Sequence, residues 1–130
     1  MNRSRKAIIA VIGLIGLFAL FYYLVEASRY PGKVSVDPVS DAQDFTLQAE
    51  AGSSQIFAIE LQFEGELSGD AVITIGLPGN PYYIRKTLKA GEIDTKYEGD
   101  WYYEQCPIRY EPKEQQMEGY LDIRYRFIRN

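Results

Sequence analysis

The stretch GDWYYEQCPIRYEP, residues 99–112, holds the only tryptophan and the only cysteine of the chain, together with three tyrosines. Trp101, Tyr102 and Tyr103 directly follow Asp100. Flat aromatic rings stack on sugars and a neighbouring acid binds hydroxyl groups, so the stretch predicts a glycan- or envelope-polymer-binding surface. We favour the alternative that Trp101 lies in the core or at its edge, because tryptophan is highly buried on average.

Strand parity decides between these two interpretations. Trp101 and Tyr103 share one parity, whereas Cys106 has the other. If one strand runs unbroken from Trp101, then Trp101 and Tyr103 point away from the face that carries Cys106. A bulge at Gly99 or Pro107 would reverse the parity and bring Trp101 into the core.

Nucleophilic catalysis finds little support in this sequence. Cys106 has no histidine to activate it, because the sequence contains none. Its parity with Ile108 and Tyr110 predicts an inward side chain that behaves as a small hydrophobe. A single cysteine forms no intramolecular disulfide and builds no cysteine-based zinc site. We therefore expect a protein that is not an enzyme and that carries no cofactor.

Four acidic residues fall within EIDTKYEGD, namely Glu92, Asp94, Glu98 and Asp100. Carboxylate oxygens bind calcium, and Asp94, Glu98 and Asp100 are the candidate ligands, although their spacing does not match an EF-hand loop. Paired carboxylates would also suit a hydrolase of cell-wall sugars. We favour a solvated hairpin end, because Asp and Glu are ordinarily exposed.

The charge balance argues against nucleic acid as a partner. After residue 27 the chain has 11 Lys and Arg against 17 Asp and Glu, a net charge of −6. Binding to a phosphate backbone needs a basic surface. Arg124, Arg126 and Arg109 are candidates for a small basic stripe. We favour an outward strand face on which arginines pair with neighbouring glutamates.

The N-terminus has the pattern of a membrane anchor. Arg3, Arg5 and Lys6 lie in a basic tail, residues 1–6, before an uncharged segment from Ala7 to Val25. As a helix these residues span about 28 Å, close to the thickness of the hydrocarbon core of a bilayer. The positive-inside rule places the N-terminus in the cytoplasm and the rest of the chain outside it, in the periplasm or at the cell surface. The lipid bilayer is therefore a predicted partner.

A cleavable signal peptide is the alternative, and it would yield a secreted domain. Val25 and Ala27 suit cleavage after Ala27. We favour an uncleaved anchor, because the apolar segment is longer than the usual signal-peptide core of about 7–15 residues.

The exported part has the pattern of β-strands. Residues 26–40 are predicted to form a linker that leads into a first strand around Lys33–Val36. From Asp44 onward apolar residues alternate with polar ones, as in IFAIELQFE (Phe57, Ile59, Leu61, Phe63) and PYYIRKTLK (Tyr82, Ile84, Leu88). We count seven or eight short strands and no helical pattern, which predicts an antiparallel β-sandwich over residues 41–130. A small β-barrel is the alternative.

One resemblance adds to this interpretation. The pattern GDWY, a Cys-x-Ile strand, YEP and then GYLDIRYRF resembles small bacterial exported domains of uncharacterised function, over residues 65–127. Some of those domains are lipid-anchored, whereas this chain lacks the cysteine that would carry the lipid. The resemblance implies a β fold and an exported bacterial setting, and it implies no catalytic residues.

The predicted function is that of a single-pass, membrane-anchored, extracytoplasmic β-sandwich. It would act as a non-catalytic interaction or accessory module that binds another envelope or membrane protein. Glycan binding through exposed aromatic residues is the alternative. A carboxylate-based hydrolase is the interpretation that the sequence supports least.

Overall fold

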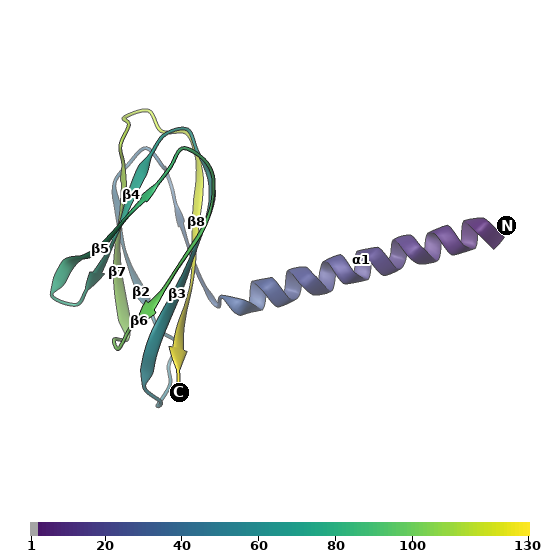
Figure 1. Ribbon diagram of the computed structural model, residues 1–130, viewed down its shortest axis with the longest axis horizontal. Helices are drawn as coiled ribbons and strands as arrows, with labels where there is room; N and C mark the ends of the chain where they lie inside the picture. Colours follow the sequence, from purple (N-terminus) through teal and green to yellow (C-terminus); the bar gives the residue numbers. More distant parts are fainter. Residues whose placement is uncertain (1–2) are drawn as a thin grey trace. The chain divides into compact units, whose positions relative to one another are not determined.

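The computed structural model describes residues 3–130, apart from the side chains of residues 25–28 and 81. The chain divides into two units, Met1–Pro31 and Gly32–Asn130. Figure 1 shows that the first unit contains the helix α1 and that the second contains the β-strands. Residues 1 and 2 of the predicted basic tail lie outside the described part, as do the side chains of Val25 and Ala27.

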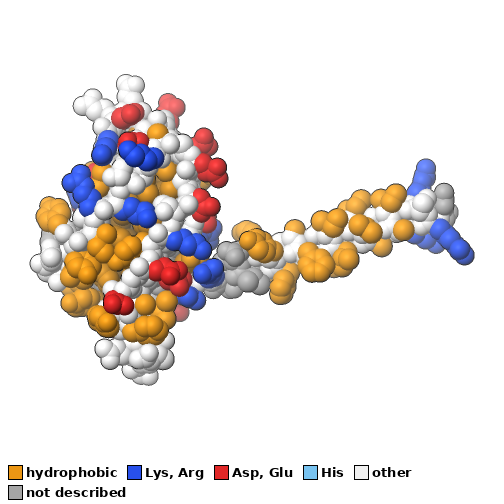
Figure 2. Space-filling view, viewed as in Figure 1, with side chains coloured by type: hydrophobic (Ala, Val, Ile, Leu, Met, Phe, Trp, Pro, Cys, Tyr) orange, Lys and Arg blue, Asp and Glu red, His pale blue; other side chains and the backbone are white. Residues whose placement is uncertain are grey.

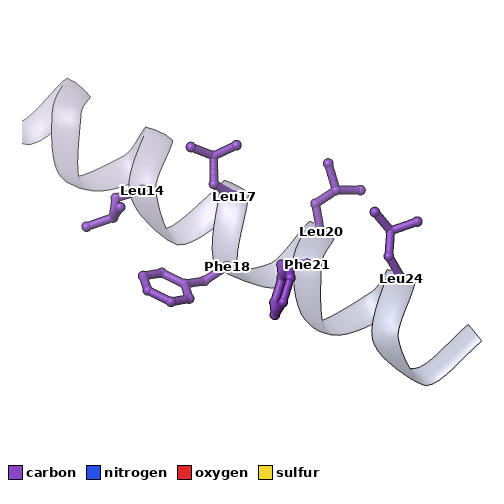
Figure 3. A pocket seen from close by; sticks show the side chains of 6 residues that line it. All are labelled: Leu14, Leu17, Phe18, Leu20, Phe21 and Leu24. Atoms are coloured by element: carbon purple, nitrogen blue, oxygen red, sulfur yellow. The ribbon is translucent and has the colours of Figure 1, made fainter. Parts of the chain in front are cut away.

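The helix α1 spans Arg3–Arg29. Its segment Arg3–Leu24 is long and apolar enough to cross a membrane, a property that signal sequences near an N-terminus share. Apolar side chains surround the helix on every side, and none of this segment is buried in the protein. Figure 3 shows six of them projecting from the helix: Leu14, Leu17, Phe18, Leu20, Phe21 and Leu24. A helix that is apolar all round suits lipid, where each backbone group must be paired within the segment.

Eight strands form two antiparallel four-stranded sheets. Sheet A has the order β1-β8-β3-β6, and its strands are β1 (Gly32–Val36), β8 (Gly119–Arg129), β3 (Ile56–Leu67) and β6 (Gly91–Asp100). Sheet B has the order β2-β7-β4-β5, and its strands are β2 (Gln43–Gln48), β7 (Gln105–Pro112), β4 (Ala71–Leu77) and β5 (Asn80–Leu88). This order is that of a jelly roll. The predicted β-sandwich is therefore confirmed, and the alternative of a small barrel is wrong.

The sandwich starts earlier than the pattern of alternation alone indicated. The strand expected around Lys33–Val36 is β1, which pairs with β8 from Gly32 opposite Tyr125 to Val36 opposite Leu121. The segment 26–40, predicted as a linker, thus contains an edge strand of sheet A.

The core lies between the two sheets. The alternating apolar residues of six strands point inward, as predicted, and at least 98% of each side chain in this list is buried: Leu47, Ile59, Leu61, Phe63, Ile73, Ile75, Leu88, Cys106, Ile108, Tyr110, Leu121 and Ile123. The hydroxyl of Tyr110 donates a hydrogen bond of 2.7 Å to the carbonyl oxygen of Val39. This bond satisfies the polar end of a ring that is otherwise surrounded by apolar side chains.

Two aromatic residues that alternation placed inside lie outside. Phe57 is 40% exposed, because the pairing of β3 with β8 shifts register between Ile56 and Ala58, and Ile56 is buried in its place. Tyr82 is 77% exposed, and the pairing of β4 with β5 also shifts register near the tip of their hairpin. A β-bulge adds a residue to one strand and thereby changes which side chains face inward.

Candidate functional site

Trp101 is a core residue. The strand β6 ends at Asp100 and β7 begins at Gln105, so Trp101 lies in the connecting loop. Its side chain is 1% exposed, and its indole Nε1–H donates a hydrogen bond of 3.2 Å to the carbonyl oxygen of Gln105. Its backbone N–H donates to the carbonyl oxygen of Phe57 at 3.2 Å. The core placement that we favoured is confirmed, and the role of Trp101 as an exposed stacking platform is wrong.

The neighbours of Trp101 remain on the surface. Tyr102 is 61% and Tyr103 is 44% exposed, and Asp100 is exposed at the end of β6. The rings of Trp101 and Tyr103 meet edge to face, with centroids 5.9 Å apart and an interplanar angle of 75°. Phe57 lies at the same end of the sandwich, since its carbonyl oxygen accepts the bond from Trp101. We call the exposed residues Phe57, Tyr102 and Tyr103 the aromatic end.

One arginine fixes the loops at this end. The guanidinium of Arg129, near the end of β8, donates bonds of 2.6 Å to the carbonyl oxygens of Glu50 and Ser54. It also pairs with the carboxylate of Glu104 at 2.8 Å. These contacts tie the β2–β3 loop to the β6–β7 loop. Sequence reasoning missed this role, because Arg129 belongs to no motif and its partners lie 25–79 residues away.

Cys106 is unsuited to surface chemistry. The residue is fully buried on β7, as its strand parity predicted. Burial away from water raises the pKa of its thiol to about 12. A protonated and enclosed thiol is neither a nucleophile nor a metal ligand near neutral pH.

The predicted calcium ligands are not brought together. Asp94, Glu98 and Asp100 are exposed along the same straight strand, β6, so Asp94 and Asp100 are separated by about 20 Å. Asp94 accepts a hydrogen bond of 2.6 Å from the amide of Gln62. Within residues 3–130, no group of three His, Cys, Asp or Glu could hold a metal ion.

The three arginines of the predicted basic stripe lie on two sheets and are paired with acids. On β8, Arg126 contacts Glu60 at 3.0 Å and Arg124 contacts Glu64 at 3.6 Å. Arg109 belongs to β7 of the other sheet. The alternative of arginines paired with neighbouring glutamates thus describes β8 correctly.

Sheet B carries a groove of about 490 Å³ that the sequence did not reveal. Residues of all four strands line it: Asp44, Phe45, Thr46, Thr74, Tyr82, Pro107, Ile108, Arg109 and Glu111. Their positions are scattered over 68 residues of sequence, so only the strand order brings them together. We call this feature the sheet B groove.

The sheet B groove combines an exposed ring with fixed polar groups. The guanidinium of Arg109 donates hydrogen bonds of 2.6 Å to Glu111 and 2.7 Å to Asp44. These bonds, with Glu111 contributing most, raise the pKa of Arg109. Tyr82 supplies a ring, and Thr46 and Thr74 supply hydroxyl groups. Such a mixture binds the side chains of a protein or the hydroxyl groups of a sugar.

No family model and no curated relative matches the chain. Among solved structures, a de novo designed double-stranded β-helix is 18% identical, over 72% of this chain and 95% of that chain, with a TM-score of 0.35. The coat protein of Tobacco streak virus is 12% identical, over 72% of this chain and 86% of that chain, with a TM-score of 0.37. Similarities of this size carry no argument about function. The resemblance to bacterial exported domains stays a prediction.

Proposed function

We propose that this chain is a single-pass membrane protein whose β-sandwich binds another envelope or membrane protein outside the cytoplasm. The observation that carries the proposal is the apolar segment Arg3–Leu24, which precedes the first strand at Gly32 by only seven residues. A binding domain on so short a connection stays at the membrane surface and meets partners there.

The orientation follows from charge. Arg3, Arg5 and Lys6 precede the apolar residues, and positive charge is retained on the cytoplasmic side. The sandwich is then extracytoplasmic. The length of the apolar segment favours an anchor that is retained rather than cleaved.

The sheet B groove is the surface that we assign to the protein partner. Tyr82 in its lining is 77% exposed, and tyrosine gives a large contact area at a small entropic cost. Arg109 is held in place by two carboxylates beside the groove. Aromatic residues and arginine are enriched at protein–protein interfaces, and Tyr82 and Arg109 supply both types here. The two acids of the lining, Asp44 and Glu111, are neutralised by Arg109.

Crosslinking of the full-length protein in its native membranes tests this assignment. Tyr82→Ala is the test variant, and Tyr120→Ala is its matched control, because Tyr120 is 59% exposed on the other sheet. We expect one dominant partner to be crosslinked to the wild type and to Tyr120→Ala, and to be lost from Tyr82→Ala. Equal crosslinking of that partner to Tyr82→Ala would contradict the assignment.

Glycan binding is a second candidate function, and the same groove favours it. The ring of Tyr82 together with the hydroxyls of Thr46 and Thr74 offers a stacking surface and hydrogen-bonding groups. Calorimetric titration of the detergent-solubilised protein with cell-wall oligosaccharides tests it. Saturable binding that disappears in Tyr82→Ala would support glycan binding in the sheet B groove. Binding heats that are the same for the wild type and Tyr82→Ala would exclude this groove as the glycan-binding site.

We do not favour catalysis as the function. Assays of the full-length protein against cell-wall sugars would show turnover if a carboxylate pair acted as a hydrolase, and that result would overturn the assignment as a binding module.

A further inference from the structure

The two ends of the sandwich differ in the side chains that they expose. The aromatic end exposes Phe57, Tyr102 and Tyr103 beside the uncharged loop segment 51–55. Its charged residues are Glu50, Asp100, Glu104 and Arg129, of which Arg129 pairs with Glu104. Figure 2 shows orange side chains over the face on which β5, β6 and β7 are labelled in Figure 1, above a lower tip of white atoms. The loops at the opposite end carry many charges: Asp37, Asp41, Asp70, Lys89, Lys113, Glu114 and Glu118.

Hydrogen bonds and one ion pair connect the loops of the aromatic end. The indole N–H of Trp101 donates a hydrogen bond to the carbonyl oxygen of Gln105, and its backbone N–H donates one to the carbonyl oxygen of Phe57. The ring of Trp101 also contacts the ring of Tyr103 edge to face. Arg129 holds the two loops that flank the rings. These contacts connect the backbone that carries Phe57, Tyr102 and Tyr103, which lowers the entropic cost of ordering that backbone on contact.

The first strand begins toward this end. β8 runs from Gly119 to Arg129, and Arg129 lies at the aromatic end. β1 is antiparallel to β8, so the start of β1 at Gly32 points toward the aromatic end and Val36 points away from it. Chain that precedes Gly32 thus reaches sheet A from the side of the aromatic end.

The connection from the apolar segment is short. Seven residues separate Leu24 from Gly32. Even fully extended they reach about 25 Å, and they reach less because α1 continues to Arg29. Gly32 lies opposite Tyr125, about 13 Å from the Arg129 end of β8 and about 20 Å from the Gly119 end, so the aromatic end is the end nearer to the connection.

We propose that the aromatic end rests on the bilayer that holds the anchor, with Phe57, Tyr102 and Tyr103 in the interfacial layer of the lipid. This inference rests on the proposed membrane anchor. Tyrosine combines an apolar ring with a polar hydroxyl and is enriched at the level of the headgroups. Residues 32–130 carry ten Lys and Arg against seventeen Asp and Glu, a net charge of −7, so the contact is with the interface itself and needs no anionic lipid.

Tryptophan fluorescence of the full-length protein in phosphatidylcholine vesicles tests this contact. Tyr102→Trp places a reporter at the aromatic end, and Tyr120→Trp places a control on an equally exposed tyrosine toward the opposite end. The emission of buried Trp101 in the wild type is subtracted from both. Brominated phosphatidylcholine quenches a reporter in the lipid, and iodide quenches a reporter in water.

We expect brominated lipid to quench the Tyr102→Trp reporter several-fold more than the Tyr120→Trp reporter, and iodide to show the reverse order. Equal quenching of both reporters by iodide, with no effect of brominated lipid on either, would overturn the inference. An alkaline wash of the same vesicles distinguishes a failure of the lipid contact from a failure of the membrane anchor. Protein that stays in the lipid while its Tyr102→Trp reporter is in water refutes the contact alone, whereas protein that is washed off refutes the anchor and the contact together.

Discussion

Replacement of Trp101 with alanine removes the largest fully buried side chain of the sandwich. The ring is 1% exposed, and a buried tryptophan hides about 200 Å² of surface. At about 25 cal/mol per Å² this area contributes about 5 kcal/mol, of which alanine retains a small part. We expect Trp101→Ala to lower the free energy of unfolding by about 3–5 kcal/mol, as such truncations do in other cores.

Trp101→Phe tests the same reasoning with a smaller change. It keeps a ring in the core but loses the bond from the indole nitrogen to the carbonyl oxygen of Gln105. We expect a loss of about 1–3 kcal/mol. This variant keeps the prediction measurable if the alanine variant does not fold, because a domain of this size is typically stable by only about 5–15 kcal/mol.

The assay is urea unfolding of the full-length protein in a mild non-ionic detergent, followed by far-ultraviolet circular dichroism. Tyr102→Ala is the matched control, because Tyr102 adjoins Trp101 but is 61% exposed. We expect this control to stay within about 0.5 kcal/mol of the wild type. If Trp101→Ala unfolded at the same urea concentration as Tyr102→Ala, the placement of Trp101 in the core would be refuted.

Three further predictions concern other groups. Because burial raises the pKa of Cys106 to about 12, a maleimide at pH 7.5 should label the thiol only after unfolding, and labelling of the folded protein would contradict its burial. Arg129→Met should lower the free energy of unfolding by about 1–3 kcal/mol and speed proteolysis of residues 50–54, because Arg129 binds the carbonyl oxygens of Glu50 and Ser54. Arg124→Met should do neither, because the ion pair of Arg124 with Glu64 is long. Limited proteolysis compares the two variants, and equal cleavage of both would refute the role of Arg129 in holding the loop. The hydrogen bond from the backbone N–H of Ala90 lowers the pKa of Asp70, so the carboxylate stabilises the fold above pH 3.8, and this contribution is lost as the pH falls through the lowered pKa. In an acid titration, Asp70→Asn should therefore lose less stability below pH 3.8 than the wild type. Identical acid titration curves for the two proteins would refute this prediction.

The sheets could be predicted because strand periodicity is a property of each segment by itself. Ile59, Leu61 and Phe63 alternate with polar residues, and all three lie in the core. Phe57 and Tyr82 were placed wrongly, because a register shift arises from how two strands pair and leaves no mark in either strand alone.

Polar residues show the same limit. Alternation puts Glu60 and Gln62 on the outer face of β3, and yet they are only 9% and 3% exposed. β3 lies inside sheet A between β8 and β6, so long neighbours cover its outer face. Glu60 pairs with Arg126, and Gln62 donates to Asp94. Burial of this kind depends on the order of the strands, which the sequence did not reveal.

The candidate sites were predictable to different degrees. Average burial alone favoured a core position for Trp101, and the structure agrees. The sheet B groove was not predictable, because its residues come from four strands that become neighbours only in the folded sheet. The role of Arg129 in joining the β2–β3 and β6–β7 loops was missed for a similar reason, since its partners are backbone carbonyl groups of one distant loop and the carboxylate of Glu104 in another.

The most direct test of a retained membrane anchor is the intact mass of the full-length protein recovered from alkaline-washed native membranes. The account predicts a mass that includes the segment Arg3–Val25, in protein that remains in the membrane after the wash. A mass that begins at Ser28, with the protein released into the soluble fraction, would mean a cleaved signal peptide and a secreted domain, and would contradict the account.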